Sequence, residues 1–198
     1  MSDEPRKGGY IPQAWLVILL ALFYGAALAG TQTALGPRIE ENKKNETYAV
    51  IPQLVEGASQ EQTKAVVVTG QNGNEQPVYQ ARAADGTLQG WVLPAQGQGF
   101  ADRIDLLIGV TPDVSTIVGL YVLDQKETPG LGALITGTKF QNQFRGISTD
   151  QPVVVVTSEP QAGQIRALTG ATISSDSVAD IVNQTIANLK EPIRKLER

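Results

Sequence analysis

Leu168-Thr169-Gly170-Ala171-Thr172-Ile173-Ser174-Ser175-Asp176 is the stretch that marks where the last helix of the fold should begin. After it, apolar residues recur at the spacing of one helix face, which predicts a helix from Val178 to Leu189. These apolar positions are Val178, Ile181, Val182, Ile186 and Leu189. The polar residues just before them are candidate N-caps, namely Ser174, Ser175 and Asp176. We therefore expect a turn that leads into a helix.

Thr172 places a hydroxyl group close to the start of this predicted helix. Backbone N–H groups and the helix dipole favour an anion there, such as a phosphate. Gly170 and Ala171 leave room for a bulky group to approach the hydroxyl. An ordinary turn with a helix cap is the alternative interpretation.

Two motifs carry a resemblance to a known family. Thr169-Gly170-Ala171-Thr172 resembles the [S/T]-G-A-T flavinylation motif of the FMN-binding domain family, and Glu127-Thr128-Pro129-Gly130-Leu131-Gly132 resembles its E-T-P-G-L-G segment. The order and spacing of the motifs also agree, and the resemblance covers roughly residues 10–190. Length and a single N-terminal apolar segment are most similar to the G subunits of Rnf electron-transport complexes. These are related to the usually longer C subunits of sodium-pumping NADH:quinone oxidoreductases.

The resemblance implies that FMN is attached to Thr172 through a phosphoester bond. The remaining cofactor-binding residues that it implies are Glu127, Thr128, Gly130, Leu131, Gly132, Thr169, Gly170, Ala171, Ile173, Ser174 and Ser175. Leu131 would offer an apolar face to the flavin ring, and N–H groups of its loop would bond the flavin carbonyls. The N–H groups of residues 173–175 and the two serine hydroxyls would hold the phosphate. No catalytic side chain and no metal ligand is implied.

Two positions depart from the family pattern. Many members carry histidine where this chain has Gln125, and an acidic residue where it has Ala133. Neither position is needed for attachment of the flavin, but both bear on the environment of the ring.

The composition excludes several classes of function. The 198 residues contain no cysteine and no histidine, so disulfides, cysteine-ligated iron–sulfur clusters and Ser-His-Asp catalysis are not available. The net charge is −4, and no basic run suggests binding to nucleic acid. Any redox chemistry must therefore come from an organic cofactor.

The N-terminal region is predicted to cross a membrane once. Gly8 to Pro37 contains no charged side chain, and residues 11–35 reach the roughly 20 residues that a bilayer requires. Tyr10 and Trp15 are typical interfacial aromatic residues. A cleavable signal peptide is the alternative, with Arg6 and Lys7 before the apolar run and Ala27-Leu28-Ala29 as the cleavage site. Flanking charges leave the orientation open, whereas the resemblance implies a domain on the periplasmic side of the cytoplasmic membrane.

The predicted fold class is α+β, with one membrane helix followed by a compact domain that contains an antiparallel sheet and a C-terminal helix. The predicted division is a tail (1–10), a transmembrane helix (11–35), a linker or helix limited by Pro52 (36–60) and an FMN-binding domain (61–198). Strands are expected at 65–69, 78–83, 90–93, 103–110, 117–123 and 153–157, the fourth and fifth as a hairpin. A short helix is expected at 139–145, a Gly-rich loop at 94–99, and an end or bend of the last helix at Pro192.

The sequence supports three hypotheses about function. The first is a membrane-anchored electron-transfer subunit of an Rnf-type ferredoxin:NAD⁺ oxidoreductase, which carries covalent FMN and works with other membrane subunits after maturation by a flavin transferase. The second is a stand-alone extracytoplasmic FMN carrier that serves another reductase. The third is a non-redox interaction domain tethered to the membrane.

Overall fold

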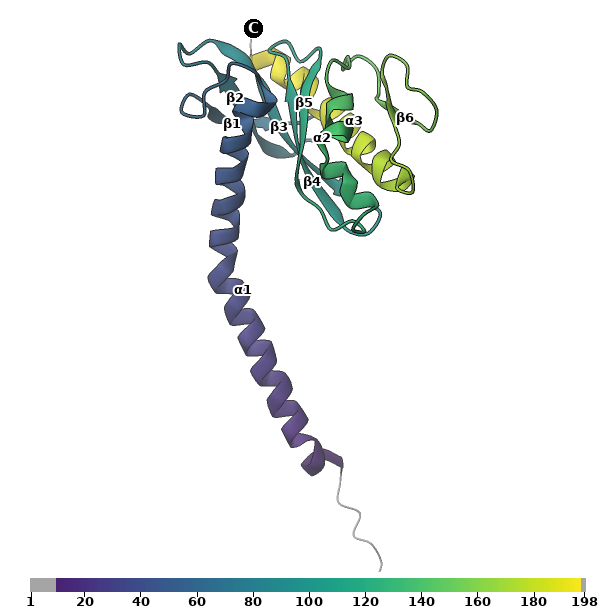
Figure 1. Cartoon of the computed structure of the whole chain (residues 1–198). Coiled ribbons are helices and arrows are strands. Elements are labelled where there is room, and N and C mark those ends of the chain that lie inside the picture. The colour runs from purple at the N-terminus through teal and green to yellow at the C-terminus, as the bar shows by residue number, and fades with distance from the viewer. Residues whose placement is uncertain (1–9, 197–198) are drawn as a thin grey trace, which may run out of the picture. The chain divides into compact units, whose positions relative to one another are not determined.

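The computed structural model describes residues 10–196, so Arg6, Lys7 and nearly all of the predicted tail lie outside the described residues. The chain divides into two units between Lys44 and Asn45. The first unit is the greater part of one helix, α1 (Tyr10–Leu54), and the second is a compact domain (Figure 1). The compact unit begins at Asn45, inside the predicted linker or helix segment 36–60.

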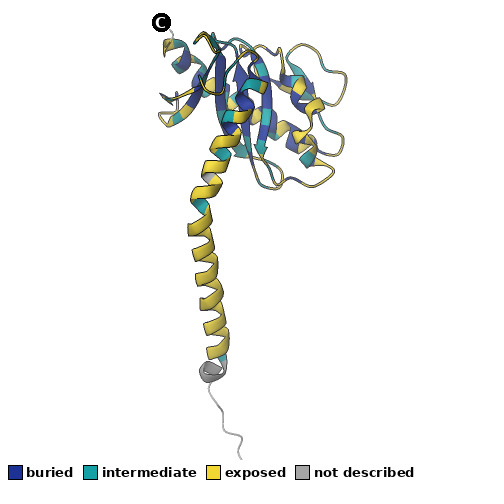
Figure 2. Ribbon diagram, turned by 60° about the vertical axis from the view of Figure 1, so that its left-hand side comes forward, coloured by how far each residue is buried: buried dark blue, intermediate teal, exposed yellow. Residues whose placement is uncertain are grey.

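Helix α1 is long and apolar enough to cross a membrane, as judged by length and composition. Its side chains between Trp15 and Leu35 are almost all exposed (Figure 2), which is the arrangement expected of a surface that meets lipid rather than protein. The predicted limit at Pro52 is wrong by two residues, because α1 continues to Leu54 and Val55 still donates its N–H to the carbonyl of Ile51 (2.9 Å). Pro52 has no backbone N–H to donate, but the buried side chains of the last turn of α1 hold this turn against the sheet.

Five antiparallel strands form the main sheet, in which each strand pairs with the next along the chain. Their bounds are β1 (Lys64–Thr69), β2 (Glu75–Arg82), β3 (Leu88–Gln98), β4 (Arg103–Val110) and β5 (Ile117–Asp124). The predicted α+β class, the antiparallel sheet and the hairpin of β4 and β5 are confirmed. The order is that of a simple meander, so the fold needs no long crossover between these strands.

The prediction of a Gly-rich loop at residues 94–99 is wrong. Strand β3 runs through this segment as far as Gln98 and pairs with β4 from Trp91 opposite Val110 to Gln98 opposite Arg103. Local composition favoured a loop, but packing against the C-terminal helix explains why a glycine stands at position 97 within a strand. A Cβ atom at this position would collide with Ile181 of the C-terminal helix, so the missing side chain lets helix and sheet approach closely.

The sheet is covered on both faces. The end of α1 packs on one face in a cluster with alternate residues of the strands, which include Tyr79, Val92 and Leu107. The C-terminal helix α3 (Thr172–Leu196) packs on the other, over the intervening residues such as Trp91 and Leu93. Period-two alternation thus divides the apolar side chains into two cores. Full burial of each large apolar side chain contributes about 1.5–3 kcal/mol.

Helix α3 begins earlier and ends later than its sequence pattern indicates. It starts at Thr172, so Ser174 and Ser175 lie in its first turn and are not N-caps. It also continues through Pro192, so of the two expected outcomes, an end or a bend, the end is wrong. The carbonyl of Asn188, which loses its helical donor to this proline, accepts the N–H of Gln71 (3.0 Å). A turn of the sheet therefore replaces the missing hydrogen bond.

A smaller layer connects β5 to α3. It contains a 3₁₀ turn η1 (Gly132–Thr136), a short helix α2 (Thr138–Gln141) and a second 3₁₀ turn η2 (Asn142–Phe144), and the last two occupy the helix predicted at 139–145. The strand expected at 153–157 is β6 (Val154–Val156), and it pairs in parallel with β7 (Gln164–Arg166), which the sequence did not indicate. Buried Phe140 and Phe144 stack edge to face at 5.7 Å and anchor this layer.

Close packing of β3 on α3 predicts the effect of a single methyl group. Gly97→Ala should lower the free energy of unfolding by about 1–3 kcal/mol, because the new Cβ meets the Ile181 side chain. In an Ile181→Ala background the same change should cost less, since the clashing atoms are gone. Urea denaturation of the four variants measures this coupling, and an equal cost in both backgrounds would contradict the packing explanation.

Candidate functional site

Glu127 is a buried carboxylate that joins three segments of the chain. Its side chain is only 4% exposed. One oxygen accepts the N–H of Ala101 in the turn between β3 and β4 (3.0 Å), and the other accepts the hydroxyl of Ser174 in the first turn of α3 (2.5 Å). Charge-assisted hydrogen bonds of this kind are among the strongest in proteins. The carboxylate therefore holds the start of α3 against the sheet, and it is not among the residues that line the hollows at the site.

Gly132 allows this bridge to form. A Cβ atom at Gly132 would lie 2.6 Å from the Ser174 hydroxyl oxygen and 2.8 Å from a Glu127 carboxylate oxygen. Such contacts are too short for any side chain. The final glycine of the Glu127–Gly132 motif is thus needed for its close approach to the first turn of α3, which directly follows the Thr169–Thr172 motif.

Gly170 brings the motifs into contact at a second point. Its φ of +78° lies in the left-handed region, and a Cβ atom there would be 3.1 Å from the side chain of Leu131. Gly130 also has a positive φ, of +75°. The loop around Leu131 closes on itself, because the N–H groups of Leu131 and Ala133 both bond to the carbonyl of Thr128 (3.1 Å each). Those two N–H groups are therefore used within the loop, and the expected bonds to a flavin stay a prediction for the other N–H groups of the loop.

Ser174 and Ser175, which follow the Thr169–Thr172 motif, are buried and hydrogen-bonded within the protein. Ser174 donates to Glu127, and Ser175 donates to the carbonyl of Ala171 (2.9 Å) while it accepts the N–H of Leu168 (3.0 Å). The N–H of Ser175 makes the first helical bond, also to Ala171 (3.0 Å). These hydroxyls thus brace the turn that carries Thr172, which differs from the expected role of holding a phosphate.

Thr172 is the first residue of α3 and is exposed. The N–H groups of the first helical residues have no partner within a helix, so they form a natural site for an anion. Thr172 and Gly170 also belong to the lining of two hollows. The Thr172 side chain is consequently exposed, close to the helix donors, and next to two hollows.

We call the smaller hollow the Leu131 pocket. It measures about 290 Å³ and is lined by Phe100, Thr128, Leu131, Gly132 and residues 170–174. Its rim is apolar and open, since Phe100 is 60% and Ile173 57% exposed. Phe100 sits on the turn whose Ala101 bonds to Glu127. At the same turn, the Arg103 N–H and then Lys126 hold the pKa of Asp102 below its ordinary value.

We call the larger hollow the Arg166 pocket. It measures about 930 Å³, and it extends from Thr172 over Leu134, Lys139 and Phe140 to Thr157 and Arg166. Lys139 and Arg166 bring positive charge to its lining, and the Arg166 guanidinium pairs with Glu159 at 3.2 Å. Gln143 fixes the backbone of Arg166 through hydrogen bonds of 2.7 and 3.2 Å.

Sequence reasoning did not find Phe100, Lys139 or Arg166. Each comes from a different segment, on the β3–β4 turn, α2 and β7, and no shared motif links them. These three residues are recognised as site residues only because the fold brings their segments close to Thr172. In the described part of the chain, no group of acidic side chains could hold a metal ion, and histidine and cysteine are lacking from the sequence.

Comparisons with known proteins show which family this chain is similar to. The family model described as FMN-binding domain matches residues 99–187, a range that contains both motifs and both pockets' contacts with Thr172. The G subunit of the ion-translocating oxidoreductase complex of Methanosarcina acetivorans is 35% identical over 173 residues, which cover 85% of this chain and 84% of that protein. The G subunit of the Na⁺-translocating ferredoxin:NAD⁺ oxidoreductase complex of Acetobacterium woodii is 30% identical, with coverages of 86% and 87%.

A solved structure supports the fold. The C subunit of the Na⁺-translocating NADH-quinone reductase from Parabacteroides distasonis, known from a crystal structure, superimposes with a TM-score of 0.60 at 24% identity. The superposition covers 77% of this chain and 94% of that one.

The family model identifies an FMN-binding domain within residues 99–187, and the solved structure shares the fold. The chain belongs to the family of G subunits of ion-translocating oxidoreductase complexes, which is related to the C subunits of Na⁺-translocating NADH-quinone reductases. Its relatives are subunits of such complexes, which supports a role as an electron-transfer subunit.

The buried bridge predicts a strong effect of its removal. Glu127→Ala should destabilise the domain by about 1–3 kcal/mol, because the buried Ser174 hydroxyl loses its acceptor, and loss of the half-buried bond from the Ala101 N–H adds to this. Glu127→Gln keeps the shape and one carbonyl oxygen, so its loss should be clearly smaller. Chemical denaturation at neutral pH tests both, and an alanine variant as stable as the wild type would refute the bridge.

Proposed function

We propose that this chain is an electron-transfer subunit that carries FMN bonded through its phosphate to the side-chain oxygen of Thr172. The main support is the position of Thr172, whose exposed hydroxyl begins α3 where the two motif loops meet. The hollows beside it are of a size suited to a cofactor, since ligand sites usually measure about 300–1,000 Å³. FMN supplies the redox chemistry of its flavin ring, which neither cysteine nor histidine is present to provide.

The start of α3 suits the phosphate. A phosphodiester keeps one negative charge, and the helix dipole with the first N–H groups of α3 stabilises such a charge. The lining of the Arg166 pocket beside Thr172 is net positive, because Lys139 and Arg166 outnumber its one acidic side chain, Glu159. Glu127 and the two buried serines act indirectly, because they fix the turn and leave the helix donors in place.

The Leu131 pocket suits the flavin ring. Apolar surface around it is exposed by Leu131, Phe100 and Ile173. Thr128 of the Glu127–Gly132 motif adds a polar group. A ring against these side chains stays open at one edge, which suits electron exchange with a partner. We therefore propose that the chain works with other membrane subunits of an Rnf-type ferredoxin:NAD⁺ oxidoreductase, and that a flavin transferase attaches the cofactor.

We further propose that the domain lies on the periplasmic side of the cytoplasmic membrane and that α1 remains as an anchor. A permanent bond suits a protein that cannot recapture lost FMN outside the cytoplasm. The length and apolar composition of α1 support the anchor.

Covalent attachment predicts a defined chemical change. The full chain produced with a flavin transferase should show flavin fluorescence on a denaturing gel, and its mass should rise by that of FMN less one water. Thr172→Ala should lose both signals and remain folded, because the threonine side chain is exposed.

Two variants control this experiment. Thr172→Ser keeps the hydroxyl and should retain flavin, whereas Thr157→Ala removes another exposed hydroxyl of the Arg166 pocket and should change nothing. An unchanged fluorescent band in Thr172→Ala would refute the proposed bond, and so would a wild-type chain that stays free of flavin beside an active transferase.

The proposed orientation predicts labelling from outside the membrane. The chain has no cysteine, so Asp85→Cys in the exposed turn between β2 and β3 provides a unique thiol. A membrane-impermeant maleimide should label this variant in intact spheroplasts as fully as after lysis. Labelling only after lysis would place the domain in the cytoplasm.

A further inference from the structure

The main sheet splits between β2 and β3. The two strands pair only from Tyr79 opposite Val92 to Arg82 opposite Leu88, although β2 begins at Glu75 and β3 continues to Gln98. Beyond this point β2 stays paired with β1, and β3 stays paired with β4. In this described part of the chain, two strand edges therefore face each other without a ladder between them.

Two prolines explain where the ladder stops. Gly99 donates its N–H to the carbonyl of Asp102 (2.8 Å). In an antiparallel strand the backbone N–H and C=O groups of successive residues point to opposite neighbours. The odd-numbered residues of β3 therefore bond to β4, and the even-numbered residues face β2. In the register of Tyr79 and Val92, the next pair that would exchange two hydrogen bonds is Pro77 with Pro94. Neither has an N–H to donate, so two carbonyl groups oppose each other and the strands separate.

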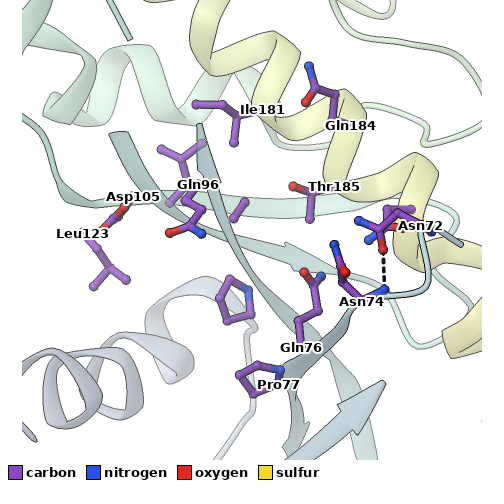
Figure 3. Close-up of a pocket in the computed structure, with 14 residues that line it drawn as sticks. Asn72, Asn74, Gln76, Pro77, Gln96, Asp105, Leu123, Ile181, Gln184 and Thr185 are labelled. Carbon is purple, nitrogen blue, oxygen red and sulfur yellow. Dashed lines mark hydrogen bonds between the residues drawn. The ribbon is translucent and has the colours of Figure 1, made fainter. Parts of the chain in front are cut away.

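The split contains a hollow of about 500 Å³ that lies beside α3 from Ile181 to Asn188, away from Thr172 at the start of this helix. Gln76, Gln96 and Thr185 surround it from three different elements (Figure 3). Its lining is rich in neutral amides, which are Asn72, Asn74, Gln76, Gln96, Gln184 and Asn188. Asp105 adds a charge to the lining, and this carboxylate pairs with Arg103 at 2.9 Å.

We propose that this split is the docking site for an extended, uncharged peptide segment of another subunit, which adds as a strand to the open edge of β3. Such a segment offers N–H donors to the carbonyls of Pro77 and Pro94, and it pairs with the backbone of Gln96. Side-chain amides both donate and accept, so they complement the alternating groups of a peptide backbone. Among the described residues that line the hollow there is no cation, which disfavours a phosphate or another anion.

Residues 93–98 of β3 limit the segment to a few residues, since a strand advances about 3.3 Å per residue. The inference uses the proposal that the chain works within a multi-subunit complex, but it does not depend on the flavin bond. Its test can therefore be carried out on the flavin-free Thr172→Ala chain as well as on the wild type.

Protection of the open edge on assembly tests the proposal. Gln96→Cys introduces a unique thiol at the exposed edge of β3. Its maleimide labelling should be at least tenfold slower in the assembled complex than in the isolated full chain, and hydrogen exchange of the amide at residue 96 should slow in parallel. Asp85→Cys, in the turn at the other end of β3, should keep its rate. Equal rates at residue 96 in both states, or equal protection at residue 85, would overturn the proposal.

Closure of the split provides a second test. Pro77→Val combined with Pro94→Val restores both missing donors, so the ladder can extend by one pair and narrow the hollow. The isolated variant should unfold at the same or a higher urea concentration, yet at least tenfold less of it should be recovered with the complex. Flavin should still be attached to Thr172, which separates failure of docking from failure of the cofactor site. A protected amide at residue 77 would show that the ladder has closed. If such a variant were still recovered with the complex as fully as the wild type, the proposal would be overturned.

Discussion

The hydrogen bonds of the Glu127 carboxylate are the constraint on which the site depends. A buried charge is costly unless donors surround it, and here the Ser174 hydroxyl and the Ala101 N–H occupy its two oxygens. The same contacts bring the start of α3, the loop after β5 and the β3–β4 turn to one place. Thr172 owes its exposed position to this arrangement, since the residues that follow it are anchored below the surface. Glu127 thus supports the site through buried hydrogen bonds to the segments that carry it.

Prolines show how strongly tertiary context decides the outcome of a local rule. Pro192 removes a helical donor, and Gln71 supplies a replacement from the neighbouring turn, so α3 continues. Pro52 lies in the last turn of α1, where burial against the sheet outweighs one lost hydrogen bond. Pro77 and Pro94 would face each other across two strands, where their missing donors leave two carbonyls opposed, and the ladder ends. One chemical property, the missing N–H, is therefore compensated, tolerated or decisive according to its neighbours.

Much of the fold could be predicted from periodicity, and the failures have physical causes. Strands β1, β4 and β5 were found because their β-branched and aliphatic runs are continuous and lie between turn residues. Strand β3 was cut short because Gly97 and Pro94 are typical of loops, whereas the pairing with β4 and the contact with Ile181 make a strand of them. The start of α3 was placed too late because serines are common N-caps, and only contacts across the fold reveal that Ser174 and Ser175 bond inward. Strand β7 has no local pattern that distinguishes it from a loop.

The sequence by itself determined the class of fold, the apolar N-terminal helix, the absence of cysteine and histidine chemistry, and the two motifs, because these are properties of composition and of neighbours along the chain. Tertiary structure alone decided that the motifs touch through Gly132 and Gly170, that Phe100 and Arg166 border the pockets beside Thr172, and that the sheet opens between β2 and β3. These features depend on which distant segments share a hydrogen bond or a van der Waals contact. Such pairings are set by packing of the whole domain, since no local pattern specifies the partner of a buried donor or of an open strand edge.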